Sequence, residues 1–106
     1  MDIRAIKQIA LEYRALLLKN NIHPDIIILF GSQAKGTAHK DSDIDLAIVS
    51  RDFKKINRKD SIRINKIAYE IDAPLEVIPV NYFEYMKKET RSPILDQIFK
   101  TGIVLF

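Results

Sequence analysis

The sequence contains no cysteine and no tryptophan, and it has only three glycines among its 106 residues. Without cysteine, the chain cannot form a disulfide framework or a thiolate zinc site. It also lacks any apolar run near the length of about 20 residues that a membrane-spanning helix needs. Its first residues start an amphipathic pattern rather than a signal peptide. We therefore expect a cytoplasmic protein that does not enter a membrane.

The composition is typical of a folded domain, because 47% of the residues are hydrophobic and 29% are charged. A chain of this length can bury one modest core, so we expect a single domain over residues 1–106. The net charge of +3, from 17 basic and 14 acidic residues, is a mild excess. This excess is compatible with a nucleotide or a nucleic acid as a ligand, but it does not indicate either of them.

Short apolar runs alternate with segments whose apolar residues recur at helical spacing. This order predicts an α/β (α+β) fold in which helices flank a small mixed sheet. Ser92 and Pro93 are suited to the N-cap and first turn of a last helix that ends at Gly102. The apolar tail after Gly102 would add a strand or pack on the core, and it would suit a homodimer contact. The other expected helices cover about 2–19 and 60–71, with a short turn or helix at 81–86, and the expected strands cover 26–30, 43–49 and 75–80.

Two of the glycines lie close together after the apolar run at 26–30. Gly31 follows that run directly, where glycine tolerates a positive φ and lets a ligand approach the backbone closely. Ser32 would be the N-cap of a short helix over 33–35, and free N–H groups at such a helix start can bind phosphate. Lys35 would add positive charge. The segment therefore indicates a phosphate site, and the alternative is an ordinary tight turn.

Two carboxylates follow in the alternating run at 43–49, where Asp43 and Asp45 point to the same face. In a strand their Cα atoms would be about 6.6–6.8 Å apart, a spacing at which carboxylates can share a cation. Without a cation they repel, since two unit charges about 4 Å apart cost about 4 kcal/mol at an effective dielectric near 20. Magnesium accepts carboxylate oxygens together with waters and phosphates. The pair therefore indicates a site for a hard cation, and the alternative is two solvated aspartates at a strand start.

Taken together, these pieces resemble a known family. The order is an apolar strand, Gly31-Ser32, Gly36 and then Ser42-Asp43-Ile44-Asp45-Leu46. It resembles the nucleotidyltransferase superfamily typified by DNA polymerase β, and more closely its small stand-alone branch, the minimal nucleotidyltransferases. The resemblance implies the polymerase-β-like nucleotidyltransferase fold, and it is specific only over residues 30–49. Many members carry arginine where this chain has Gln33.

A third carboxylate is expected on the third strand. Glu76 shares a face there with Ile78 and Val80, and a carboxylate among aliphatic residues needs water or a charged partner. Its place after the intervening helix matches the third acidic position of the superfamily, which is commonly aspartate. Asp72, at the end of the preceding helix, is the alternative for this position, and a merely solvated Glu76 is the other alternative.

The resemblance implies a Mg²⁺-dependent transfer of a nucleoside monophosphate, most simply AMP from ATP, to a hydroxyl acceptor. Minimal nucleotidyltransferases are often paired with a HEPN-type toxin, which they neutralise in some cases by transferring AMP to a toxin tyrosine. The implied partner is thus a HEPN-type protein, for which this chain would be the antitoxin. The implied catalytic residues, which would also bind two Mg²⁺ ions, are Asp43, Asp45 and Glu76, and the implied nucleotide-binding residues are Gly31, Ser32, Lys35 and Ser42.

Two other functions stay open on the sequence. A non-catalytic antitoxin would keep the fold and neutralise its partner by contact alone. A nucleic-acid-binding domain would use a group of basic residues that could attract a polyanion, although such a group is also typical of a solvated helix face. We expect ATP and a HEPN-type protein, rather than a nucleic acid, as the partners. The basic residues are Arg51, Lys54, Lys55, Arg58, Lys59, Arg63 and Lys66.

Overall fold

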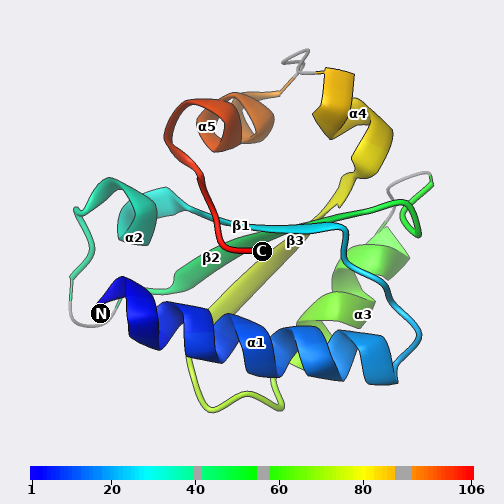
Figure 1. The fold of residues 1–106 in the computed structure, drawn as a ribbon, viewed down its shortest axis with the longest axis horizontal. Helices are drawn as coiled ribbons and strands as arrows, with labels where there is room; N and C mark the ends of the chain where they lie inside the picture. The colour runs from blue at the N-terminus through cyan, green and yellow to red at the C-terminus, as the bar shows by residue number, and fades with distance from the viewer. Residues whose placement is uncertain (40–41, 55–57, 88–91) are drawn as a thin grey trace.

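The computed structural model describes residues 1–39, 42–54, 58–87 and 92–106. In these ranges the chain forms three layers, with a mixed sheet in the middle and helices on both of its faces (Figure 1). The expected small mixed sheet flanked by helices is therefore confirmed. The elements in chain order are α1 (Ile3–Lys19), β1 (Ile26–Phe30), α2 (Gly31–Lys35), β2 (Ile44–Ser50), α3 (Arg58–Ala68), β3 (Leu75–Asn81), α4 (Tyr82–Lys87), α5 (Pro93–Thr101) and β4 (Ile103–Val104).

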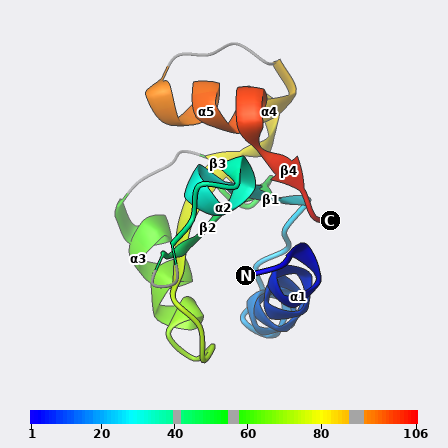
Figure 2. The ribbon, with the colours of Figure 1, turned by 90° about the vertical axis from the view of Figure 1, so that its left-hand side faces the viewer.

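The sheet has the strand order β3-β2-β1-β4. β1 runs antiparallel to both β2 and β4, whereas β2 and β3 are parallel and are connected through α3. Figure 2 shows α1 and α3 below the sheet and α4 and α5 above it, so both faces are covered. This arrangement explains why β1 is apolar at every position, because side chains alternate between the two faces and both faces are buried.

Each face of the sheet has its own core cluster. Ile44, Leu46 and Ile48 of β2 pack with residues of α1 and α3, while Ala47 and Val49 pack with residues of α5 on the opposite face. The predicted division of the second strand between two faces is therefore confirmed. Since Asp45 alternates with Leu46, it belongs to the same face as Ala47, near the beginning of the strand. None of the helices in the described ranges is long and apolar enough to cross a membrane.

Tyr13 connects α1 to α3 in the lower layer. Its side chain is completely buried, and its hydroxyl donates a hydrogen bond of 2.9 Å to the carbonyl oxygen of Ile64. Burial raises the pKa of Tyr13, so the phenol stays protonated and remains a donor at neutral pH. Tyr13 is therefore a core residue that joins the two helices of this layer.

Several element ends differ from the sequence-based expectation. α1 begins at Ile3, because Asp2 is its N-cap and accepts a hydrogen bond from the N–H of Ala5. α3 spans Arg58–Ala68 rather than 60–71. Ile71 is nevertheless buried, since the chain continues into a tighter turn in which its N–H bonds to the carbonyl of Ala68. The apolar periodicity predicted which residues are buried, but not where the helical hydrogen bonds stop.

The last third of the chain follows the expectations closely. Ser92 caps α5 by accepting a hydrogen bond from the N–H of Leu95, and Gly102 ends the helix. Asn81 caps α4 through a bond from the N–H of Glu84. The tail after Gly102 forms the added strand β4 beside β1. β3 is an edge strand, and Pro79 suits that place because proline cannot donate to a neighbouring strand.

Candidate active site

The site begins where β1 turns into α2. Gly31 has a φ of +73°, and a side chain there would overlap Oδ2 of Asp45, which packs directly against the glycine backbone. Only glycine fits both conditions without strain. The positive φ expected at Gly31 is confirmed, and the group packed against its backbone is the carboxylate of Asp45. The close approach of a ligand to Gly31 stays a prediction.

Ser32 was expected to be the N-cap of α2, and this prediction is wrong. The helix starts at Gly31, one position earlier, and the extended residue Phe30 takes the N-cap position without a side-chain hydrogen bond. The turn at Gly31 lets the strand enter the helix directly, so no capping hydroxyl is used. Ser32 is half-buried within the first turn of α2, and Lys35 is exposed at its end.

The carboxylates come from adjacent strands. Asp45 lies on β2 opposite Phe30 on one side and Glu76 of β3 on the other. Neighbouring strands are about 4.8 Å apart and residues in register point to the same face, so Asp45 and Glu76 project together from the sheet. Asp43 does not belong to the strand, which was expected to start there. β2 begins at the next residue, Ile44, whose N–H donates a hydrogen bond to the carbonyl of Pro74.

The electrostatics show that these carboxylates are close. Burial, followed by the negative charges of Glu76 and Asp43, raises the pKa of Asp45 above its ordinary value. Within the described ranges, none of the three carboxylates forms an ion pair with a basic side chain. Among the described residues the cluster is therefore uncompensated, and a cation beside it would relieve the repulsion.

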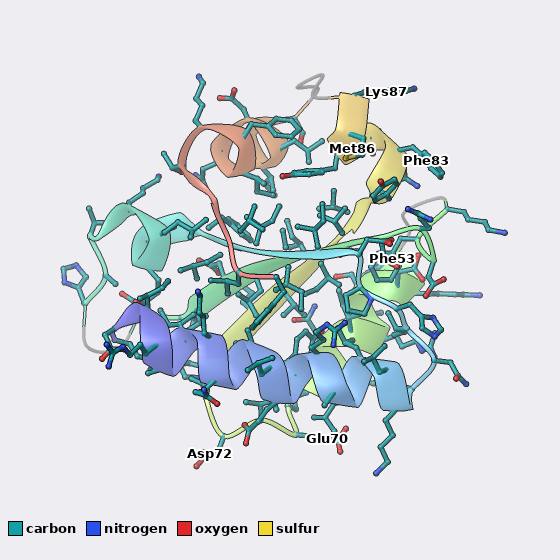
Figure 3. The ribbon with its side chains drawn as sticks, viewed as in Figure 1. Phe53, Glu70, Asp72, Phe83, Met86 and Lys87 are labelled. Carbon is teal, nitrogen blue, oxygen red and sulfur yellow. The ribbon has the colours of Figure 1, made fainter. Side chains whose placement is uncertain are left out.

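Asp72, the alternative third carboxylate, lies elsewhere. It is exposed in the loop between α3 and β3, and its labelled side chain points away from the sheet in Figure 3. Glu76, in contrast, is in register with Asp45. Between the two alternatives that the sequence left open, the geometry favours Glu76.

Ser42 organises the segment that leads into β2. Its hydroxyl accepts a 2.7 Å hydrogen bond from the N–H of His39, and its own N–H bonds to the carbonyl of that residue. The side-chain amide of Gln33, on α2, lies 3.5 Å from the carbonyl oxygen of Ser42. Sequence reasoning had noted Gln33 only as a replacement for arginine. In the structure it connects α2 to the residue before Asp43.

The donor set suits a magnesium ion that is completed by a substrate. In the described part of the chain, no group of three or more His, Asp and Glu side chains is arranged to hold a metal by itself. Magnesium, however, is commonly bound by one or two carboxylates together with substrate phosphates and waters. Asp45 with its two acidic neighbours fits that pattern, since their charges already act on one another.

A groove adjoins the carboxylates between α3 and the outer edge of β3. It has a volume of about 400 Å³, and Asp43, Glu76, Ser61, Asn65 and Tyr69 contribute to its lining. Sequence reasoning missed the last three residues, because their common location depends on how α3 packs beside β3. The sequence offered one signal, a tyrosine within the helix expected over 60–71.

The basic residues considered for nucleic acid are partly engaged within the protein. Arg51 lies 3.7 Å from Asp25, and its guanidinium is 4.4 Å from the ring centre of Tyr82. Arg63 donates a 2.6 Å hydrogen bond to the carbonyl of Asn20. Lys55 lies outside the described residues. Two of the group thus have structural contacts, and the remaining described ones are exposed on α3 and the loop before it.

Comparison with known proteins gives consistent results. The family model "Polymerase beta, Nucleotidyltransferase" matches residues 15–106. MJ0141 of Methanocaldococcus jannaschii, named as a candidate protein adenylyltransferase, is 26% identical over 87 residues, which are 82% of each chain. A chain of a toxin–antitoxin crystal structure with AMP-PNP is 26% identical with a TM-score of 0.60, covering 94% of this chain and 72% of that one. A chain from the complex of the tri-AMPylated Shewanella oneidensis HEPN toxin with its MNT antitoxin shares the fold, with 24% identity, a TM-score of 0.54 and coverage of 94% and 71%.

Proposed function

The chain belongs to the polymerase β nucleotidyltransferase family, and from that premise we propose that it transfers AMP from ATP to a hydroxyl group of a partner protein. The single observation that carries the proposal is the register of Asp45 with Glu76, with Gly31 packed against the carboxylate of Asp45. A glycine turn beside a pair of carboxylates can accept a triphosphate and the cation that accompanies it. AMP as the transferred group is supported by the name of MJ0141 and by the AMP-PNP complex.

Mg²⁺ would be held by Asp43, Asp45 and Glu76, with two ions as the family resemblance implies. When bound, it would neutralise charge on the triphosphate and on the leaving pyrophosphate. The residues of the chain have separate tasks in this scheme. The backbone at Gly31 and Ser32, together with Lys35, would hold the phosphates.

Glu76 would accept the proton of the attacking hydroxyl. It is exposed on the edge strand, where an acceptor can reach it. Ser42 would act indirectly, because its hydrogen bonds with His39 fix the segment before Asp43. Catalysis would depend mainly on orientation and charge neutralisation, as in other phosphoryl transfers.

The proposed partner is a HEPN-type protein that this chain would neutralise as an antitoxin. Both of the similar solved structures described above are toxin–antitoxin complexes, and one of them contains a HEPN toxin modified with AMP. A tyrosine hydroxyl of such a partner would be the acceptor. We propose ATP and this protein as partners, and no nucleic acid.

The test is a calorimetric titration of ATP with and without Mg²⁺. We expect metal-dependent binding to the wild-type chain and its loss in Asp43→Asn/Asp45→Asn. Asp72→Asn is the matched control, because it removes the same charge from an exposed loop carboxylate away from the site. Binding that is equal in the double variant and in the control would disprove the assignment of the site.

Neutralisation by contact alone is the second candidate function. It is favoured by Glu76, which stands where the third acidic position of the superfamily is commonly aspartate. A contact-only antitoxin would protect its partner from toxicity equally well with and without the Asp43→Asn/Asp45→Asn changes. An enzymatic antitoxin would lose protection in the same variant.

A further inference from the structure

The groove between α3 and β3 lies on the acceptor side of the proposed site. Gly31 follows β1, Asp45 is on β2 and Glu76 is on β3, and these three strands are neighbours in that order. Gly31, which is proposed to hold the phosphates, and the groove beyond Glu76 are therefore on opposite sides of Asp45. Phosphoryl transfer places the attacking and leaving oxygens roughly in line. If pyrophosphate leaves toward Gly31, the attacking hydroxyl must come from the groove.

The edge strand forms a fixed wall of this groove. The side-chain amide of Asn65 donates to the carbonyl of Val77 at 2.9 Å and accepts from its N–H at 3.2 Å. Pro79 has no N–H to offer further along the same strand. An acceptor in the groove is thus presented as a side chain rather than as an added β-strand.

The groove already contains a hydroxyl that is suited to this position. Tyr69 lines it together with Asp43 and Glu76, and 85% of the tyrosine is exposed. Only residues 69–74 separate α3 from β3, so Tyr69 lies near the end of β3 that carries Glu76. The other tyrosines of the chain are accounted for by packing, since one is buried in the lower core and two pack on the upper cluster. Tyr69 has no such packing role.

We propose that Tyr69 is itself an AMP acceptor, so that the chain modifies its own groove; the proposal rests on the proposed nucleotidyl transfer. The phenolic oxygen of Tyr69 attacks the α-phosphorus of ATP and forms a new P–O bond. The bond between the α-phosphorus and its bridging oxygen to the β-phosphate breaks, and pyrophosphate leaves. Glu76 takes the phenolic proton and releases it to water. The product is a tyrosyl-AMP phosphodiester.

This modification would regulate the same site. The attached adenosine monophosphate would occupy the groove through which a partner's hydroxyl has to enter. A modified chain would therefore bind ATP but transfer AMP to a partner more slowly than an unmodified chain. The reaction would also occur within one chain, because Tyr69, Asp43 and Glu76 line one groove.

The experiment incubates the full chain with ATP and MgCl₂ and measures its intact mass, followed by peptide mapping. We expect one AMP adduct on Tyr69, with a labelled fraction at a given time that does not depend on protein concentration. Tyr69→Phe should remove the adduct while keeping metal-dependent ATP binding. Tyr85→Phe is the matched control, because this tyrosine packs beside the upper cluster on the other face, and it should be labelled as the wild type is.

The outcomes separate this inference from the function on which it rests. An adduct that persists in Tyr69→Phe, or an unlabelled wild type that still binds ATP with Mg²⁺, would overturn the inference and leave the proposed function standing. A wild type without metal-dependent ATP binding would overturn both. Tyr69→Phe should fold as the wild type does, since Tyr69 is mostly exposed.

Discussion

Two glycines at the ends of α2 allow a direct test of how Asp45 is positioned. Gly31 and Gly36 both have left-handed backbones, with φ values of +73° and +75°. A Cβ at Gly36 would meet no atom within 4 Å, whereas a Cβ at Gly31 would collide with Oδ2 of Asp45 and lie 3.2 Å from its Cγ. Gly31→Ala and Gly36→Ala therefore share the same backbone strain, and only the first also displaces the carboxylate.

The magnitudes follow from this difference. A left-handed conformation costs a non-glycine residue about 1–2 kcal/mol, and 1 kcal/mol lowers Tm by about 4–8 °C in a domain of 60–100 residues. Both variants should thus unfold at lower temperature than the wild type, with the larger fall for Gly31→Ala. The two variants should differ much more in their rate of AMP transfer, because a displacement of about 1 Å at a reacting centre can lower the rate about 100-fold.

The assay compares thermal unfolding and AMP transfer in the two variants, below both unfolding transitions. We expect Gly36→Ala to keep transfer within several-fold of the wild type and Gly31→Ala to lose about 100-fold, as estimated above for a displaced group. Equal transfer in the two variants would refute the reasoning, because it would show that the contact between Gly31 and Asp45 does not position the reacting centre. Equal unfolding temperatures would show that Asp45 moves away at no cost.

Three further changes test the packing and the charges. Tyr13→Phe removes the buried hydrogen bond to Ile64, so chemical denaturation should show a loss of about 1 kcal/mol. Burial and the neighbouring carboxylates raise the pKa of Asp45, so the contribution of Asp45 to stability is present at acidic pH and is lost as the pH rises through its folded pKa. Asp45→Asn should therefore be more stable than the wild type at neutral pH without metal. This difference in stability should vanish in acid. The backbone hydrogen bond from His23 lowers the pKa of Asp52, so the contribution of Asp52 to stability has the opposite pH dependence. Asp52→Asn should be less stable than the wild type at neutral pH. This difference in stability should be lost as the pH falls through the folded pKa of Asp52. Thermal unfolding over a pH series measures both changes, and a parallel pH dependence of the two variants would contradict the assignments.

Much of the fold could be predicted from the sequence, and the features that were missed or wrongly predicted have a common cause. The strand at 26–30 and the cap at Ser92 were predicted, because each depends on residues close together in the chain. The hydrogen-bond partner of His23 was not predicted, because it is Asp52, which is 29 positions further along the chain and 3.1 Å from Nδ1 of His23. The N-cap at Ser32 failed because a glycine at positive φ can begin a helix without a capping side chain.

The sequence by itself determined the chemical types at the site. Gly31 after an apolar strand, two aspartates at alternate positions and a glutamate on a later strand were visible from spacing alone, because strands have a period of two residues. The family resemblance depended on the same local pattern. It did not require knowledge of which strands are neighbours.

Only the tertiary structure decided which of these groups lie together. The parallel pairing of β2 and β3 places Glu76, rather than Asp72, opposite Asp45, and the packing of α3 beside β3 brings Tyr69 into a groove with Asp43. Register and helix packing are set by the burial of side chains from distant segments, such as Tyr13 against α3. No local pattern contains that information, because the contacts that fix it join residues tens of positions apart.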